Sequence, residues 1–167
     1  MPPRRLAVRA SSLLLTVPLA LVVTGCDAPA TLDPADAAAT YADVQEDLVA
    51  ALGGPAGWDT TGEASLSGED GSCTLVLPRA TTQQYLAADD GSTDDVASAL
   101  DPVLAEHGFS ELGDGESVEG GAVVADASDD DGAEVVVASE QTSSLSVTVP
   151  VDPAACDGEG SFPVPTS

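Results

Sequence analysis

The chain of 167 residues has very little positive charge, and it contains no lysine, asparagine or isoleucine. Four arginines stand against 29 aspartates and glutamates, which gives a formal net charge of -25 at pH 7. Nucleic-acid phosphates repel a protein of this charge, so DNA or RNA binding is excluded as a function. The length is that of one ordinary domain with its own hydrophobic core.

Histidines and aromatic residues are also scarce, and their scarcity excludes several enzyme classes. His107 is the only histidine, so a His-Glu-x-x-His zinc motif is impossible, and no Gly-x-Ser-x-Gly motif is present. Five aromatic residues offer few platforms for a sugar, so the many carboxylates do not indicate a glycosidase. His107 follows a predicted helix and is interpreted as a capping or surface residue. We therefore expect no catalytic residue, no cofactor and no enzymatic activity.

The N-terminal residues differ in composition from everything that follows. Three arginines lie within the first nine residues, and residues 10–23 form an uncharged, mainly apolar run. This run is short for a helix that crosses a bilayer, whereas a basic start followed by a short apolar segment is typical of secretory signals. The pattern predicts a signal peptide over residues 1–25.

The residues Val23-Thr24-Gly25-Cys26 resemble the lipobox of bacterial exported lipoproteins, and all four positions match it. The resemblance implies cleavage between Gly25 and Cys26 and a diacylglyceryl anchor on the Cys26 thiol. With the lack of residues encoded by AT-rich codons, the chain resembles small lipoproteins of high-GC Gram-positive bacteria. An ordinary signal peptide with an incidental cysteine, or an uncleaved anchor helix, is the alternative.

Cys73 and Cys156 remain as an even pair once Cys26 is assigned to lipid. In an oxidising compartment such a pair favours a structural disulfide. A redox or metal-binding pair is the alternative, but there is no Cys-x-x-Cys spacing and only one histidine to complete a metal site.

Apolar spacing and turn residues predict two helices. The first covers residues 34–52, with Asp33 as its N-cap and Gly53-Gly54 at its end. The second begins at Ser92 and ends at Gly108. Pro102 lies inside it and predicts a kink or break near Asp101.

Short runs between turn residues predict about five strands. A hairpin is expected around the turn Gly68-Glu69-Asp70-Gly71. Three further runs rich in valine predict an antiparallel meander over residues 117–125, 133–140 and 143–151. The fold class is therefore α+β, with the order α-β-β-α-β-β-β and both helices on one face of an antiparallel sheet. We expect a tether over 26–32, one domain over 33–156 and a loose tail over 157–167.

The second face of this sheet is the least determined surface. Val135-Val136-Val137 places apolar side chains on both faces, so the second face is either covered by the N-terminal region or exposed as a patch for a partner.

Arg79 is the single basic residue that would remain after cleavage at Cys26. An internal ion pair with a carboxylate is the simpler interpretation. The alternative is that Arg79 binds an anionic ligand or a carboxylate of a partner.

Acidic runs at Asp89-Asp90 and at residues 126–131 supply oxygen ligands of the kind that calcium prefers. The EF-hand spacing fails, because Ala127 and Ala138 stand where carboxylates are required. The sequence therefore predicts no specific metal site, and Asp129 to Asp131 are interpreted as a solvated turn.

These features predict a monomeric, non-enzymatic domain held on the extracytoplasmic face of the cell membrane by its diacylglyceryl anchor. We expect it to bind or scaffold another component of the cell envelope. A surface lipoprotein that binds a small ligand or calcium is the alternative.

Overall fold

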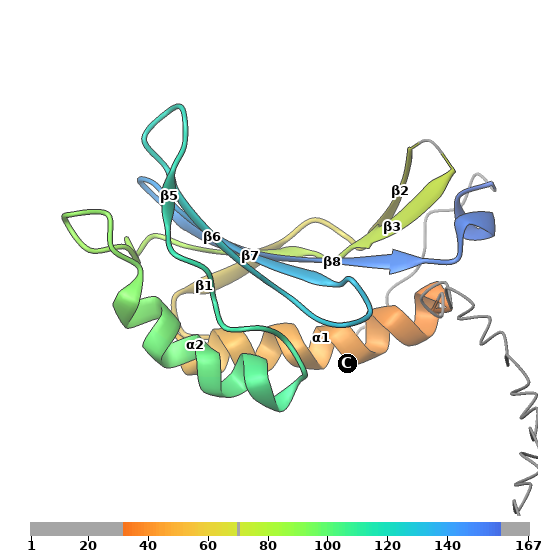
Figure 1. The fold of residues 1–167 in the computed structure, drawn as a ribbon, viewed down its shortest axis with the longest axis horizontal. Coiled ribbons are helices and arrows are strands. Elements are labelled where there is room, and N and C mark those ends of the chain that lie inside the picture. Colours follow the sequence, from red (N-terminus) through yellow and green to blue (C-terminus); the bar gives the residue numbers. More distant parts are fainter. Residues whose placement is uncertain (1–31, 70, 158–167) are drawn as a thin grey trace, which may run out of the picture.

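The computed structural model describes residues 32–69 and 71–157, which form one antiparallel sheet and two helices. Helices α1 (Pro34–Ala51) and α2 (Asp94–Glu106) lie on the same face of the sheet (Figure 1). The α+β class and the placement of both helices on one face are thus confirmed. The predicted signal peptide, Cys26 and the tail beyond Asp157 lie outside the described residues.

All strand pairs of the sheet are antiparallel. The strands are β1 (Trp58–Thr61), β2 (Ser65–Glu69), β3 (Ser72–Val76), β4 (Arg79–Thr82), β5 (Glu116–Ser117), β6 (Val123–Ser128), β7 (Glu134–Ser139) and β8 (Ser143–Val151). Their order is β1-β4-β8-β7-β6-β5, and β3 pairs with both β2 and the second half of β8. The short 3-10 helix η1 (Pro153–Cys156) follows β8.

The sheet has eight strands where the sequence predicts about five, so the predicted element order is wrong. The hairpin predicted around residues 68–71 is present as β2–β3, whereas β1 and β4, which pair with each other, were not predicted. Val76 pairs with Thr148 and Ala80 with Leu145, so the three residues between Val76 and Ala80 face two residues of β8. This is the geometry of a bulge, and Pro78, which has no N–H to donate, lies within it.

The third predicted strand is also misplaced. The structure has the two-residue strand β5 at Glu116, a turn closed by Gly121 N donating to Val118 O at 3.1 Å, and then β6 from Val123. Gly120 and Gly121 both have a positive φ, which lies outside the β region of backbone conformations. The predicted strand is therefore interrupted at these two residues.

Helix α1 forms as its sequence predicts. Asp33 accepts a 2.9 Å hydrogen bond from the Ala35 N–H, and Pro34 occupies the first turn. Its buried side chains pack onto the sheet; among them Ala37 and Leu48 are fully buried.

Helix α2 begins one residue later than predicted, with Thr93 rather than Ser92 at the N-cap position. The Thr93 hydroxyl accepts from Gly115 N at 3.1 Å, which joins the helix start to the segment before β5. The helix continues through Pro102, so of the predicted kink or break near Asp101 the break does not occur. Burial of Leu100 and Leu104, which flank the proline, holds this segment against the core.

Candidate functional site

The sheet has a second face that no described helix or strand covers (Figure 1). Along β8, Leu145, Val147 and Val149 are fully buried toward the helices, and the residues between them are partly exposed on the other side. Hairpin β2–β3 and the β5 end of the sheet both rise on this uncovered side in Figure 1. The N-terminal residues 1–31, which were the alternative cover for this face, lie outside the described residues.

We call this uncovered surface the open face. The alternation of burial and the pairing register assign residues of five strands to it, among them Thr74, Val76, Arg79, Thr81, Val124, Asp126, Ser128, Glu134, Val136, Ala138, Ser144, Ser146, Thr148 and Pro150. Most of these side chains are short, either hydroxyl or aliphatic, and none is aromatic.

The strand register arranges these side chains in rows across the sheet. One row runs Val124, Ala138, Ser144, Thr81, and the next runs Asp126, Val136, Ser146. A third row runs Ser128, Glu134, Thr148, Val76. The rows differ in which strand holds the valine.

The valines of successive rows follow a diagonal. Val76 on β3, Val136 on β7 and Val124 on β6 are each partly buried, and Ala138 lies beside Val124. Neighbouring strands lie about 4.8 Å apart and each residue rises about 3.4 Å, so the diagonal is roughly 20 Å long. We call these four residues the aliphatic diagonal; Ser146 and Thr148 interrupt it.

Charged side chains stand on both sides of this diagonal. Asp126 and Glu134 are exposed on the β6 and β7 side. Arg79 is exposed on the β4 side, opposite Thr61 of β1. Among the described residues Arg79 forms no salt bridge, so the expected internal ion pair is not found there. Its guanidinium projects from the open face.

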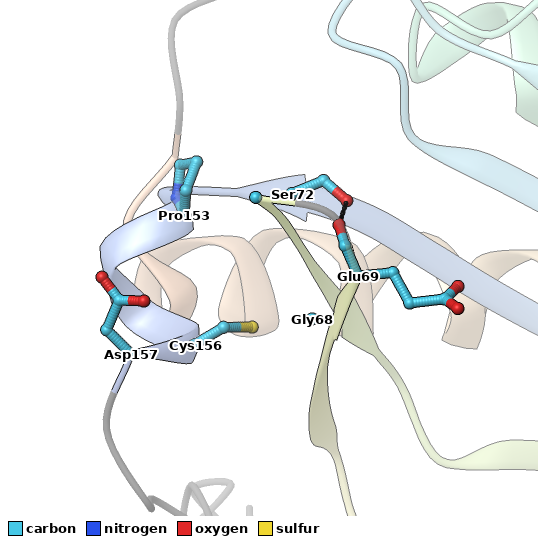
Figure 2. Close-up of a pocket in the computed structure, with 7 residues that line it drawn as sticks. Gly68, Glu69, Ser72, Pro153, Cys156 and Asp157 are labelled. Atoms are coloured by element: carbon cyan, nitrogen blue, oxygen red, sulfur yellow. Dashed lines mark hydrogen bonds between the residues drawn. The ribbon is translucent and has the colours of Figure 1, made fainter.

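A cavity with a volume of about 330 Å³ lies between the β2–β3 turn and η1 (Figure 2). Its lining residues are Gly68, Glu69, Gly71, Ser72, Pro153, Cys156 and Asp157. The Ser72 hydroxyl donates a 2.6 Å hydrogen bond to the Glu69 carbonyl, so it is already engaged. Glu69 and Asp157 are the two acidic residues of the lining.

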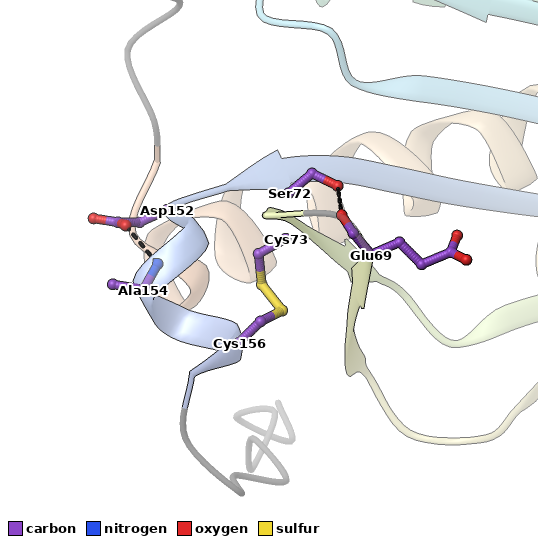
Figure 3. Close-up of a disulfide and its surroundings, with 6 residues drawn as sticks. All are labelled: Glu69, Ser72, Cys73, Asp152, Ala154 and Cys156. Carbon is purple, nitrogen blue, oxygen red and sulfur yellow. Dashed lines mark hydrogen bonds between the residues drawn. A yellow bond between two sulfur atoms is a disulfide. The ribbon is translucent and has the colours of Figure 1, made fainter.

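The two cysteines of the predicted pair are bonded, with their sulfur atoms 2.04 Å apart (Figure 3). Cys73 is buried in β3, and Cys156 ends η1 directly after β8. Asp152 caps η1 by accepting from Ala154 N at 2.9 Å. A Cβ at Gly68 would lie 3.0 Å from the Cβ of Cys156, so the glycine leaves room for the bridge.

His107 and Asp129, which the sequence analysis interpreted as structural residues, both form side-chain contacts within the fold. His107 lies 3.0 Å from Asp47 and joins α2 to α1. Asp129 accepts hydrogen bonds from Tyr41, Asp131 and Ala133, which organises the β6–β7 turn. No three metal-ligating side chains gather anywhere in residues 32–69 and 71–157.

Sequence reasoning missed the aliphatic diagonal, because it depends on the register between strands rather than on any motif. The run Val135-Val136-Val137 was the one available signal, since its middle residue had to face away from its neighbours.

Within the part of the chain that the structure describes, no helix is long and apolar enough to cross a membrane. Compared with known protein families, curated proteins and solved structures, the chain has no match.

Proposed function

We propose that this protein is a lipid-anchored extracytoplasmic domain that binds a partner protein of the cell envelope through the open face and has no enzymatic activity. The observation that supports this most is the uncovered sheet face with partly exposed valines. An antiparallel sheet can leave one face in water, but water favours polar side chains there. The open face instead has partly exposed valines among its hydroxyl side chains, and these short side chains form a flat surface that another protein can approach closely.

The position of Leu32, the first residue that the structure describes, supports the membrane-anchor part of the proposal. Leu32 pairs with Val151 at the end of β8, and Asp152 N donates to the Leu32 carbonyl at 3.2 Å. Cys26 precedes Leu32 by 32 - 26 = 6 residues. Six extended residues span at most about 20 Å, so an anchor at Cys26 keeps the domain close to the membrane.

Site-specific photo-cross-linking in intact cells tests the proposal. A photoreactive residue replaces Ser146 on the open face in one variant and Asp43 on the exposed side of α1 in the control. The full chain is expressed in intact cells, so that it stays in its own membrane. A photoreactive residue is used because the chain has no lysine side chain for an amine-reactive cross-linker. We expect one dominant protein adduct from position 146 and none from position 43. Equal adducts from both positions, or no adduct from 146, would contradict the proposal.

A carrier of calcium or a small ligand is the second candidate, because the acidic residues Glu69 and Asp157 are among those that line the cavity in Figure 2. A ligand that binds the folded state raises its unfolding temperature by mass action. An unfolding midpoint that does not change with millimolar calcium or with a metabolite panel removes this candidate.

A further inference from the structure

We infer that the open face receives one elongated segment of the partner protein, with cationic side chains on its β6 and β7 side and a carboxylate opposite Arg79. This inference rests on the proposed function, and it specifies the chemistry of the partner.

The apolar part of the contact is the aliphatic diagonal. Val76, Val136 and Val124 are all partly buried within the protein itself, yet water still reaches them. The row register places them along a line of roughly 20 Å across the strands. A stripe of apolar side chains on a partner segment, laid along this line, would remove that surface from water.

The size of the face favours a segment over a whole domain. The open face is four strands wide, because β3 and β4 lie end to end beside β8. Four strands about 4.8 Å apart and about six residues long give an area on the order of 400 Å². A stable protein interface buries about 800 Å² on each partner. A second copy of this chain is further disfavoured, because each copy has 29 acidic residues and they repel one another.

Charge sets the orientation of the segment. Asp126 and Glu134 are exposed, and neither carboxylate accepts a hydrogen bond from a described residue. They lie on adjacent strands, offset by two residues because Asp126 pairs with Val136, and both are on one side of the aliphatic diagonal. Two carboxylates with no cation beside them complement lysine or arginine side chains of the partner.

On the opposite side of the aliphatic diagonal, one position is positively charged. Arg79 projects there without a salt bridge to any described carboxylate, and a guanidinium pairs bidentately with a carboxylate. Asp59 is the nearest acid by register, since it lies diagonally across from Arg79 on β1, but the two form no salt bridge. An acidic residue of the partner can therefore form a salt bridge with Arg79.

Other classes of partner fit this surface poorly. Phosphates and anionic lipid headgroups are repelled by the acidic surface of the domain. A carbohydrate would need aromatic platforms, and the open face has none. A protein segment of mixed charge fits both sides of the diagonal.

The test compares charge-altered variants by the yield of the position-146 adduct in intact cells. The double variant Asp126→Lys with Glu134→Lys should reduce the adduct at least about fivefold. The control Asp43→Lys with Glu46→Lys makes the same change in net charge on the exposed side of α1 and should leave the yield within about twofold.

Arg79→Glu separates local pairing from general attraction. If a basic partner were attracted only by overall negative charge, this variant would raise the yield. The inferred carboxylate opposite Arg79 predicts a fall of at least about threefold. A position-146 adduct that responds equally to open-face and α1 variants, or rises with Arg79→Glu, overturns the inference and leaves the proposed function standing. The absence of any position-146 adduct overturns both.

Discussion

The Tyr41 hydroxyl donates a 2.6 Å hydrogen bond to Oδ2 of Asp129, which joins the middle of α1 to the β6–β7 turn 88 residues later. Oδ1 of the same carboxylate accepts from the N–H groups of Asp131 and Ala133, at 3.0 and 2.8 Å. The ring of Tyr41 also meets Phe109 edge-on, with centroids 6.2 Å apart. One aspartate thus fixes both the shape of the turn and its position over the helix.

Tyr41→Phe should lower the free energy of unfolding by about 1 to 2 kcal/mol, because it removes the phenolic donor and keeps the ring. Asp129→Ala should cost more, since it also removes the acceptor of the two backbone N–H groups in the turn. Urea unfolding of both single variants and of the double variant measures this. If the hydrogen bond stabilises the fold, the effects of the two substitutions will be less than additive.

Alkaline pH should weaken the same contact. Burial of Tyr41 and the neighbouring Asp129 carboxylate raise the pKa of the phenol above its ordinary value of 10.0. A group whose pKa is higher in the folded state contributes stability below its unfolded pKa and loses that contribution as the pH rises. Stability should therefore fall above about pH 10, as the unfolded chain ionises first.

The matched control for this pH effect is the chain's other tyrosine in the described part, Tyr85, which is 46% exposed. Short urea titrations between pH 8 and pH 11 should show that Tyr41→Phe flattens the decline and that Tyr85→Phe keeps it. The same decline in all three proteins would rule out Tyr41 as its origin.

The sequence predicts α1 almost to the residue, because its signals are local: the Asp33 cap, Pro34 in the first turn and Gly53 with a φ of +106° after the helix. The break between β3 and β4 has no such local signal. It depends on the register with β8 and on Gln45 of α1, whose amide donates to the Pro78 carbonyl at 2.8 Å across 33 residues. A single sequence does not show which distant donor will satisfy that carbonyl.

The candidate site shows the same division between local and long-range information. Alternation predicts that Val136 faces away from its neighbours, but the diagonal that it forms with Val76 requires the pairing of β3, β8 and β7. Among the described residues Arg79 lacks the expected ion pair for a related reason. Abundance of carboxylates raises the chance of pairing, but the register places Asp126 and Glu134 on the far side of the open face.

Loss of the disulfide should destabilise the domain strongly. Cys73 and Cys156 are 83 residues apart, and closing a loop of that length favours the native state by about 4 to 5 kcal/mol on the chain-entropy model. The double variant Cys73→Ala with Cys156→Ala should lower the free energy of unfolding by that amount, measured as a lower midpoint in urea. Two free thiols in the exported protein, found by alkylation and intact mass, would contradict the pairing.

A buried pair of hydroxyls should control the loop that follows β4. Ser139 Oγ and Ser143 Oγ lie 2.9 Å apart, and together they accept from the Leu86 and Ala87 N–H groups at 3.0 to 3.2 Å. Ser139→Ala leaves the Ala87 N–H without its acceptor and should cost about 1 to 3 kcal/mol. Amide exchange at positions 86 and 87 should accelerate more than elsewhere in the domain. Ser144→Ala on the open face is the control and should leave these two amides unchanged.

The anchor assignment is tested most directly by the chemistry of its cysteine. If Cys26 receives diacylglycerol, cells fed radiolabelled palmitate should label the unaltered protein, and Cys26→Ala should abolish the label and release the protein from its normal membrane pool. The double variant Cys73→Ala with Cys156→Ala keeps Cys26 and should remain labelled, which separates loss of the acylated thiol from loss of folding. Incorporation that survives Cys26→Ala would mean that another group is acylated, and the 20 Å limit on the reach of the tether would no longer apply.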